Sequence, residues 1–269
     1  MSTADPFANL ATGYDAAFSR RSLGVWLRQR VHDTLDRVLP TKGRVLDLGC
    51  GTGEDALWLA QRGLDVDAVD SSAMMLELAN DKIMRAGLGA HVRFHECDLN
   101  ADLTPLAGPY DAAVSDFGAL NAVENRVQFA RSLGRLLRTE APLVAVVMGP
   151  LCPWEVAVSL WRAQPAAAFR RFKQGRPATL PGVGDGEGPA LWYPGPGRLR
   201  ADFAPWFQDA RFRGIGTLLP ASAMGGLVER WPRAFDALKP LDAWLGKRAV
   251  SAWVSDHYAL VARRSTEAA

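Results

Sequence analysis

Residues 44–53 read RVLDLGCGTG and decide the fold of this chain. Strand-forming residues give way to glycines at positions 49, 51 and 53, and an acidic and then apolar helical pattern follows. Glycine at this spacing lets the backbone turn tightly and come close to a ligand, where a side chain would collide. The ligand then faces the amide groups at the start of the next helix. The stretch therefore predicts a ligand-binding turn, with an ordinary glycine-rich turn as the alternative.

The sequence around this turn alternates between strand and helix patterns up to residue 150. An amphipathic helix with an aliphatic residue at every fourth position comes first, at 23–38. The predicted strands lie at 44–49, 65–70, 91–98, 110–115 and 143–148, and the predicted helices at 54–61, 74–87 and 122–138. Alternation at this spacing implies right-handed crossovers and a parallel sheet covered on both faces.

The pattern changes after residue 150, where seven of the nine tryptophans lie. A helical segment at 154–173 contains Pro165, which must kink or split it. A loop rich in glycine and proline follows at 175–197, and loops of this length are either mobile or functional. The remaining predicted elements are a short helix at 199–207, a strand at 211–219, a helical insertion at 224–248 and a closing strand at 257–262.

The composition is that of an ordinary globular protein, with 48% hydrophobic and 22% charged residues in a chain of 269. A net charge of +2 gives no reason to expect nucleic acid, which needs a clustered basic face. Three widely spaced cysteines favour a reducing compartment without disulfides. The sequence shows no signal peptide and no membrane-spanning window, so we expect a cytoplasmic protein. No group of histidines, cysteines and acids has ligand spacing, so we expect no metal.

The residue after the turn restricts which ligand the turn can hold. The dinucleotide fingerprint needs glycine or alanine at position 54, where the helix packs on the strand, but the chain has Glu54. A glutamate there would also repel a pyrophosphate. A phosphate loop is excluded, because no Gly-Lys-Ser/Thr follows the glycines. The candidate that remains is a cationic cofactor without phosphate, which suits the acids around the turn.

The run from Leu46 to Gly53, LDLGCGTG, resembles the first motif of the class I S-adenosylmethionine-dependent methyltransferases. The resemblance covers the order of elements from about 40 to 150 and includes the acids that end the second and third strands. It implies an α/β, Rossmann-like fold with a seven-stranded, mostly parallel sheet, helices on both faces and helical cap insertions. The later half is similar, more loosely, to bacterial small-molecule methyltransferases with a cap between strands five and six.

From this resemblance we expect one structural domain in three parts. A lid segment and helix occupy 1–40, the cofactor-binding core occupies 41–150, and the cap insertions with the last two sheet strands occupy 151–269. The expected cofactor is S-adenosylmethionine. The expected activity is transfer of its methyl group to a small acceptor by in-line displacement.

The resemblance also assigns residues to the cofactor. Asp70, at the end of its strand, would accept the ribose hydroxyls, with a helix-capping acid as the alternative. Asp98 and the backbone of Leu99 would meet the adenine amino group, with a plain surface acid as the alternative for Asp98. Met75 would flank the ring or simply fill the core. The complete predicted set for the cofactor is Tyr14, Asp47, Gly49, Cys50, Gly51, Gly53, Asp70, Ser71, Met75, Asp98, Leu99, Asp116 and Phe117.

Two residues are candidates for catalysis. Asp116 lies in the motif that the family places beside the transferred methyl group, where it would act as a base, position an amine or only hold the sulfonium side. His257 would act as a base or serve as a buried structural histidine. A magnesium site at Asp116 and Asn121 is a further alternative.

The acceptor is less defined than the cofactor. The predicted acceptor-binding residues are Phe18, Asn121, Trp154, Trp192 and Tyr193. Tyr14 and Phe18 precede the first helix, where relatives use a lid, and an aromatic ring there would stabilise a cation. Each single tryptophan is expected to pack in a core rather than to contact the acceptor, but as a set they favour an apolar or aromatic small molecule. The alternatives are a protein or RNA methyltransferase, or a non-catalytic protein that binds S-adenosylmethionine, and the sequence leaves the methylated atom and the oligomeric state open.

Overall fold

Seven strands form one sheet in a computed structural model that describes residues 11, 13–103, 105–173, 175–177 and 189–266. Their order is β3-β2-β1-β4-β5-β9-β8. The strands are β1 (Arg44–Leu48), β2 (Asp65–Asp70), β3 (Val92–Glu96), β4 (Ala112–Ser115), β5 (Pro142–Met148), β8 (Phe207–Ile215) and β9 (His257–Arg264). The first five are parallel, and β9 runs antiparallel to both of its neighbours. The predicted mostly parallel, seven-stranded α/β sheet is thus confirmed.

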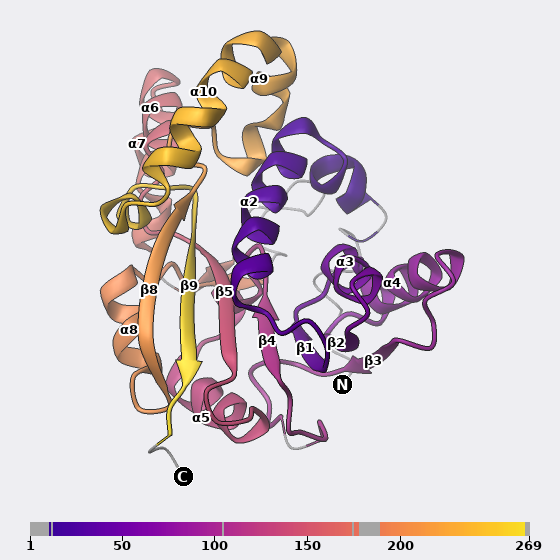
Figure 1. Ribbon diagram of the computed structural model, residues 1–269. Coiled ribbons are helices and arrows are strands. Elements are labelled where there is room, and N and C mark those ends of the chain that lie inside the picture. The colour runs from indigo at the N-terminus through magenta and orange to yellow at the C-terminus, as the bar shows by residue number, and fades with distance from the viewer. Residues whose placement is uncertain (1–10, 12, 104, 174, 178–188, 267–269) are drawn as a thin grey trace.

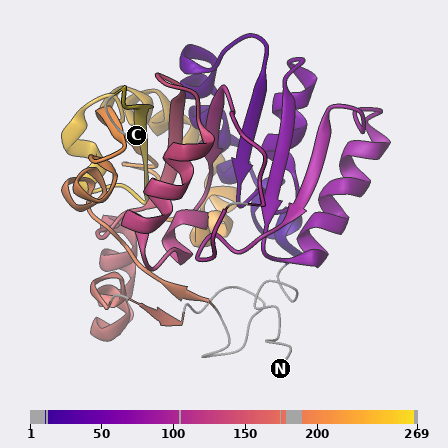
Figure 2. The ribbon, with the colours of Figure 1, turned by 90° about the horizontal axis from the view of Figure 1, so that it is seen from below.

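Helices cover both faces of this sheet (Figures 1 and 2). The helices are α2 (Ser22–Val38), α3 (Glu54–Gln61), α4 (Ala73–Arg85), α5 (Arg126–Leu136) and α8 (Pro196–Phe203). The buried strand β5 shows how the faces are divided, because successive side chains of a strand point to opposite sides. Val144 and Val146 belong to the core that Leu27 of α2 enters, whereas Leu143 and Val147 belong to the core of α5 and α8.

The insertions gather at one end of the sheet. Figure 1 draws β9 running down, so that the antiparallel β5 runs up and the carboxyl ends of the parallel strands lie at the top. Around that end lie α6 and α7 from one insertion and α9 and α10 from the other. The inserted elements are α6 (Pro153–Trp161), α7 (Pro165–Ala168), η3 (Arg170–Phe172), β6 (Arg176–Pro177), β7 (Ala190–Leu191), η4 (Ser222–Met224), α9 (Gly225–Arg230), α10 (Pro232–Leu245) and η5 (Ala249–Trp253).

Several predicted boundaries change for local reasons. The segment 154–173 is split where Pro165 begins α7, as the sequence predicts. The predicted loop 175–197 contributes the short ribbon β6–β7, and residues 178–188 lie outside the described part of the chain. Strand β8 begins four residues before the prediction, because a bulge between Gln208 and Arg211 interrupts the alternation that marks a strand. The predicted helix 122–138 begins at Arg126, capped by the Asn125 side chain.

Among the described residues, no helix combines the length and the apolar character that crossing a bilayer requires.

Candidate active site

A cavity of about 720 Å³ lies at the carboxyl ends of the parallel strands, between the glycine turn and the insertions. Its volume is in the range of small-molecule sites. The structure brings together 13 of the predicted site residues in its lining: Tyr14, Phe18, Gly49, Gly51, Asp70, Ser71, Met75, Asp98, Leu99, Asp116, Phe117, Tyr193 and His257.

The three glycines of the turn share a backbone conformation that favours glycine, and their surroundings differ. Gly49, Gly51 and Gly53 all have positive φ angles, of 76°, 51° and 78°. A Cβ on Gly49 would lie 2.1 Å from the Cβ of Ala119, and one on Gly53 would lie 2.8 Å from the Cβ of Ala79 on α4. A Cβ on Gly51 would meet nothing within 4 Å, because this face of the turn is open to the cavity. Gly51 is therefore the point where a ligand can approach the backbone.

Asp70 fixes the turn from the end of β2. One of its carboxylate oxygens accepts a hydrogen bond from the backbone N–H of Gly51 at 2.9 Å, and the other accepts one from the N–H of Ser72 at 3.0 Å. Ser72 in turn caps α4, since its hydroxyl accepts from the N–H of Met75. The carboxylate is thus held at the cavity wall, with its orientation set by the backbone.

The strand β3, the parallel neighbour of β2, ends beside Asp70 at the same edge of the sheet. Asp98 and Leu99 follow this strand, and Asp98 accepts hydrogen bonds from the backbone and the side chain of Asn100, at 2.9 and 3.2 Å. Asn100 also lines the cavity and was not among the predicted residues. With Asp70 on the neighbouring strand, these groups form an acidic and polar edge along the cavity.

A buried charge cluster that the sequence did not predict lies beside the turn. Arg28 of α2 pairs with Asp55 of α3, and the second oxygen of Asp55 lies 2.8 Å from Nε2 of His32. Burial raises the pKa of Asp55, but Arg28 and His32 outweigh it and hold that pKa well below the ordinary value of 3.8. Arg28 and His32 stand four residues apart on one face of a helix, and this spacing is the signal that could have revealed the cluster.

Asp116 faces the same cluster from the end of β4. Burial, together with repulsion from Asp55, raises its pKa well above 3.8. One carboxylate oxygen accepts from the N–H of Phe117 at 2.9 Å. The other is buried, lies 4.0 Å from Nη1 of Arg28, and has no hydrogen-bond partner within the described part of the chain. A buried oxygen in this state at a cavity wall is suited to a positively charged or hydrogen-bonding ligand group.

The ring of Phe117 packs against side chains from three separate parts of the chain. Its centroid lies 4.8 Å from that of Phe18, 5.4 Å from that of His257 and 5.0 Å from the guanidinium carbon of Arg28. Phe117 holds this place with a φ of 44°, a left-handed conformation that a bulky residue rarely adopts. Strain of this kind is characteristic of functional sites, where the surrounding packing maintains it.

Residues 13–20, which belong to the predicted lid segment and are called the lid segment below, line part of the cavity and are fastened to the turn. Asp15 accepts a hydrogen bond from the Thr52 hydroxyl at 2.6 Å and pairs with Nζ of Lys82 at 3.0 Å. Lys82 also pairs with Glu54, so the residue that excludes a dinucleotide helps to hold the lid. Above this contact Tyr14 and Phe18 line the cavity, and burial raises the pKa of Tyr14 to about 12.

Replacing Asp15 with asparagine is expected to speed the release of S-adenosylhomocysteine about 3- to 10-fold, because a half-buried ion pair contributes ~1 kcal/mol. Burial raises the pKa of Asp15, but Thr52 and Lys82 outweigh it and hold that pKa below 3.8. The contact is therefore complete above pH 3.8 and weakens as the pH falls below it. Stopped-flow displacement measures the release rate. Asp81→Asn, which breaks an exposed pair with Arg85 on the same helix, is the control and should leave the rate unchanged.

On the acceptor side, polar groups from both insertions meet at the start of β9. His257 lies opposite Met148 of β5, so the antiparallel register places it at the same edge as the turn. Its Nδ1 lies 3.1 Å from a carboxylate oxygen of Asp256. Arg171 forms ion pairs with Asp256 and Glu155, and these pairs offset the cost of burying both acids. This cluster comes from three separate segments, and only His257 was predicted.

Six predicted residues lie outside the cavity lining. Gly53 packs α3 against α4, Cys50 is buried behind the turn, and Asp47 is buried within β1, where burial and the nearby Asp55 raise its pKa. The indole N–H of Trp154 donates to the carbonyl of Leu218, and its ring packs on Phe235. The Trp192 ring packs beside Gly175. None of the nine tryptophans lines the cavity.

Asn121, the sixth, joins an insertion to the sheet. Its side-chain amide donates to the carbonyls of Met148 and Trp192, at 3.1 and 2.6 Å, and its carbonyl oxygen accepts from the N–H of Met148 at 2.8 Å. The Asn121 side chain is fully buried. This residue therefore sets the position of the segment around residue 192 rather than contacting a ligand.

Replacing Asn121 with alanine is expected to lower the free energy of unfolding by about 3 kcal/mol or more, since each buried group left without a partner costs ~1–3 kcal/mol. Urea denaturation measures this change. Gln29→Ala removes an exposed amide that bonds only to Asp33, and it should cost less than about 0.5 kcal/mol. A loss in Asn121→Ala as small as in this control would contradict the structural role.

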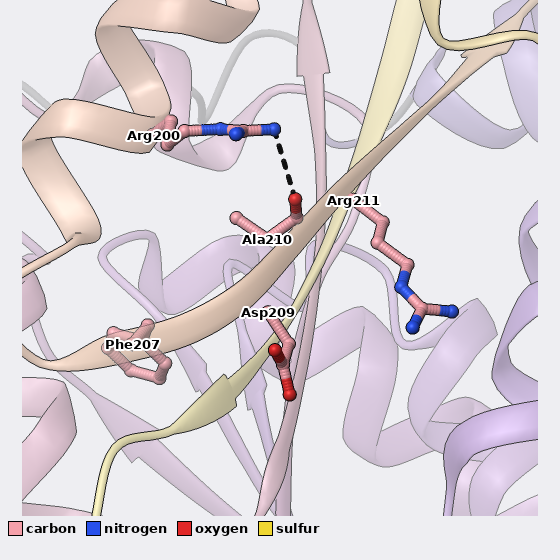
Figure 3. Close-up of a pocket in the computed structure, with 5 residues that line it drawn as sticks. All are labelled: Arg200, Phe207, Asp209, Ala210 and Arg211. Atoms are coloured by element: carbon pink, nitrogen blue, oxygen red, sulfur yellow. Dashed lines mark hydrogen bonds between the residues drawn. The ribbon is translucent and has the colours of Figure 1, made fainter.

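A second hollow, of about 340 Å³, lies at the bulge of β8, near the amino end of β5 (Figure 3). Arg200 of α8 donates to the carbonyl of Ala210 at 3.1 Å there, and the side chain of Arg211 points away from Arg200. Asp209 has a φ of 56°, which belongs to the bulge. The hollow lies at the opposite edge of the sheet from the glycine turn and includes none of the predicted residues.

Within the described residues, no three histidine, cysteine, aspartate or glutamate side chains could hold a metal ion.

Comparisons with known proteins agree with this geometry. Residues 45–140 match the family model described as a methyltransferase domain. The demethylmenaquinone methyltransferase of Thermus thermophilus is 35% identical over 141 residues, 51% of this chain and 60% of the relative. The tRNA 5-carboxymethoxyuridine methyltransferase of Escherichia coli is 36% identical over 102 residues, 35% of this chain and 39% of the relative. The chain thus spans between about a third and 60% of the curated relatives it matches.

A solved structure extends the similarity to the whole fold. The phosphoethanolamine N-methyltransferase 2 of Haemonchus contortus, in complex with S-adenosyl-L-methionine, has a TM-score of 0.58 at 18% identity, covering 98% of this chain and 58% of that one. Residues 45–140 therefore match a methyltransferase domain, and the fold of the chain is that of a solved methyltransferase, in agreement with the resemblance to the class I S-adenosylmethionine-dependent enzymes. The cofactor that this resemblance implies is S-adenosylmethionine.

The residues present fit this cofactor. The open face of Gly51 leaves the space that a bound molecule needs beside the backbone, and the Asp70 carboxylate is fixed next to it. The buried oxygen of Asp116, without a hydrogen-bond partner in the described residues, provides a place for a positive group.

Proposed function

We propose that this protein transfers a methyl group from S-adenosylmethionine to a small-molecule acceptor. The observation that carries the proposal is one continuous cavity, which runs from the glycine turn to Glu155, Arg170 and His257. A cavity of this size can align two small reactants and exclude water, which are the main needs of a displacement at carbon.

The cofactor supplies an electrophilic methyl group on a positively charged sulfur. Asp70 would bind the ribose hydroxyls, and Asp98 with the Leu99 backbone would bind the adenine. Asp116 would hold positive charge near the junction of the two reactants. The rings of Phe18 and Phe117 pack edge to face at this junction and would attract a nearby cation.

His257 is the residue we assign as the base. It is buried, lines the cavity, and has Asp256 behind it, which is itself held by Arg171 and by the N–H of Ser222 at 2.7 Å. A neutral imidazole in this place can take the proton that an O–H or N–H acceptor loses on methylation. Asp116 remains the alternative base.

The acceptor is expected to be partly apolar. Met148, Leu191 and Tyr193 line its side of the cavity with apolar surface, while Glu155 and Arg170 supply polar groups. This apolar surface replaces the tryptophans as the support for an apolar or aromatic acceptor.

An RNA acceptor is the competing function, because one relative is named for its action on tRNA. The test is incubation with methyl-labelled cofactor and either a panel of small metabolites or total RNA. The proposal expects label in a small product, and label found in RNA alone would refute it.

A further inference from the structure

The acceptor side of the cavity contains two successive arginines with different surroundings. Arg171 is buried, and its guanidinium donates to Glu155 at 2.7 Å, to Asp256 at 2.6 Å and to the carbonyls of Gly149 and Asp256. These contacts use the donors of Arg171 within the protein, so this residue has a structural role. Arg170, its neighbour, is bound at one end only.

Arg170 presents the outer edge of its guanidinium at the cavity. Its Nε pairs with Glu155, which fixes the plane of the group, and its Nη1 lies 3.5 Å from the hydroxyl of the buried Tyr193. The hydrogen bonds among the described residues leave both N–H groups of its Nη2 without a protein acceptor. The side chain is 39% exposed and lines the cavity together with Tyr193, so this edge can be reached by a ligand.

We propose that the acceptor carries a carboxylate that binds end-on to the Nη1–Nη2 edge of Arg170. A guanidinium matches a carboxylate with two parallel hydrogen bonds, and the Nη1–Nη2 edge, which Glu155 leaves unused, offers two nitrogens side by side. This inference rests on the proposed function and names the chemical class of its acceptor.

The charges around Arg170 permit this binding. Glu155 is the acid nearest to Arg170, and its two oxygens are divided between Arg170 and Arg171. Asp256 pairs with Arg171 and accepts from the N–H of Ser222. The two arginines and two acids therefore balance, and an added carboxylate meets a fixed donor edge rather than an excess of negative charge.

The test uses three matched pairs of small probes that differ only in charge: benzoate and benzamide, phenylacetate and phenylacetamide, and hexanoate and hexanamide. Binding to the full chain, first loaded with S-adenosylhomocysteine, is measured by ligand-observed NMR. We expect the acid of at least one pair to bind about tenfold more tightly than its amide, as hydrogen bonds to charged groups provide. If no acid binds more tightly than its amide, or no acid binds at all, the inference is overturned.

Variants assign the preference to one side chain. Arg170→Gln should abolish the preference for the acid, and Arg170→Lys, which keeps the charge without the two-nitrogen edge, should restore only part of it. Lys173→Gln removes an exposed charge three residues away and should leave the preference intact. A preference that survives Arg170→Gln would refute the assignment.

Binding of S-adenosylhomocysteine distinguishes a failure of the proposed methyl transfer from a failure of the carboxylate acceptor alone. Arg170→Gln should bind this product as the native chain does, because Arg170 lies on the acceptor side and Arg171 still holds Glu155. Failure of the native chain to bind it would refute the proposed function. Normal binding without any preference for acids would refute only the carboxylate acceptor.

Discussion

Replacing Gly51 with valine is expected to weaken S-adenosylmethionine binding about 100-fold or more, to the limit of calorimetric detection. The valine side chain would enter the open space beside the turn, where a Cβ meets no protein atom within 4 Å. A ligand that lies on the backbone would lose that space, and a 100-fold loss corresponds to roughly 3 kcal/mol, the upper end of ordinary overpacking costs.

Gly63 provides a matched control for the backbone. It also has a left-handed φ, of 79°, and a Cβ there would likewise meet nothing within 4 Å, but it ends α3 outside the cavity. Gly63→Val should therefore lose a similar stability, about 1–2 kcal/mol, without losing affinity. Equal affinities of the two variants for S-adenosylmethionine would show that the cofactor does not lie against Gly51.

The second large effect is expected at Asp70. Asp70→Ala should lose S-adenosylmethionine affinity by about tenfold or more, because hydrogen bonds to a charged group contribute ~1.5–3 kcal/mol. The substitution also frees the N–H of Gly51, which Asp70 holds at 2.9 Å, so the turn loses its anchor as well as a ligand contact. Isothermal titration calorimetry measures the change.

The opposite end of the same strand supplies the control for Asp70. Asp65 begins β2, is exposed, and lies 3.1 Å from Nδ1 of His91. Asp65→Ala removes the same charge from the same strand and should bind the cofactor as the native chain does. Unchanged affinity in Asp70→Ala, with the fold intact by circular dichroism, would remove Asp70 from the site.

The cofactor half of the molecule could be predicted because its signals are local. The glycine turn, the acids that follow β2 and β3, and the alternation of strands and helices all lie within short windows of sequence. The topology then brings the strand ends together at one edge, as parallel sheets do. Asp70, Asp98 and Asp116 meet around the cavity for this reason.

The charge clusters could not be predicted in the same way, because their members are far apart in sequence. Arg28 and Asp55 come from two helices, and Glu155, Arg171 and Asp256 come from α6, η3 and the residue before β9. Each residue alone reads as an ordinary helical or loop charge. Only the packing of these elements shows that the members of each cluster are buried together.

The tryptophans are a local feature of the sequence that did not indicate which residues line the cavity. Their concentration after residue 150 suggested an aromatic pocket, but Trp154 packs on Phe235, and Trp161 is 85% exposed. Composition indicates where large side chains are and does not indicate which face of a helix they occupy. The acceptor side is instead lined by residues such as Tyr193 and Arg170.

Calorimetric titration of the native chain with S-adenosylmethionine, and separately with NAD, tests the central claim most directly. The turn with Glu54, Asp70 and the buried Asp116 should bind S-adenosylmethionine at a single site and give no heat with NAD. Binding of NAD, or no binding of S-adenosylmethionine, would contradict the assignment of this cavity to the methyl donor.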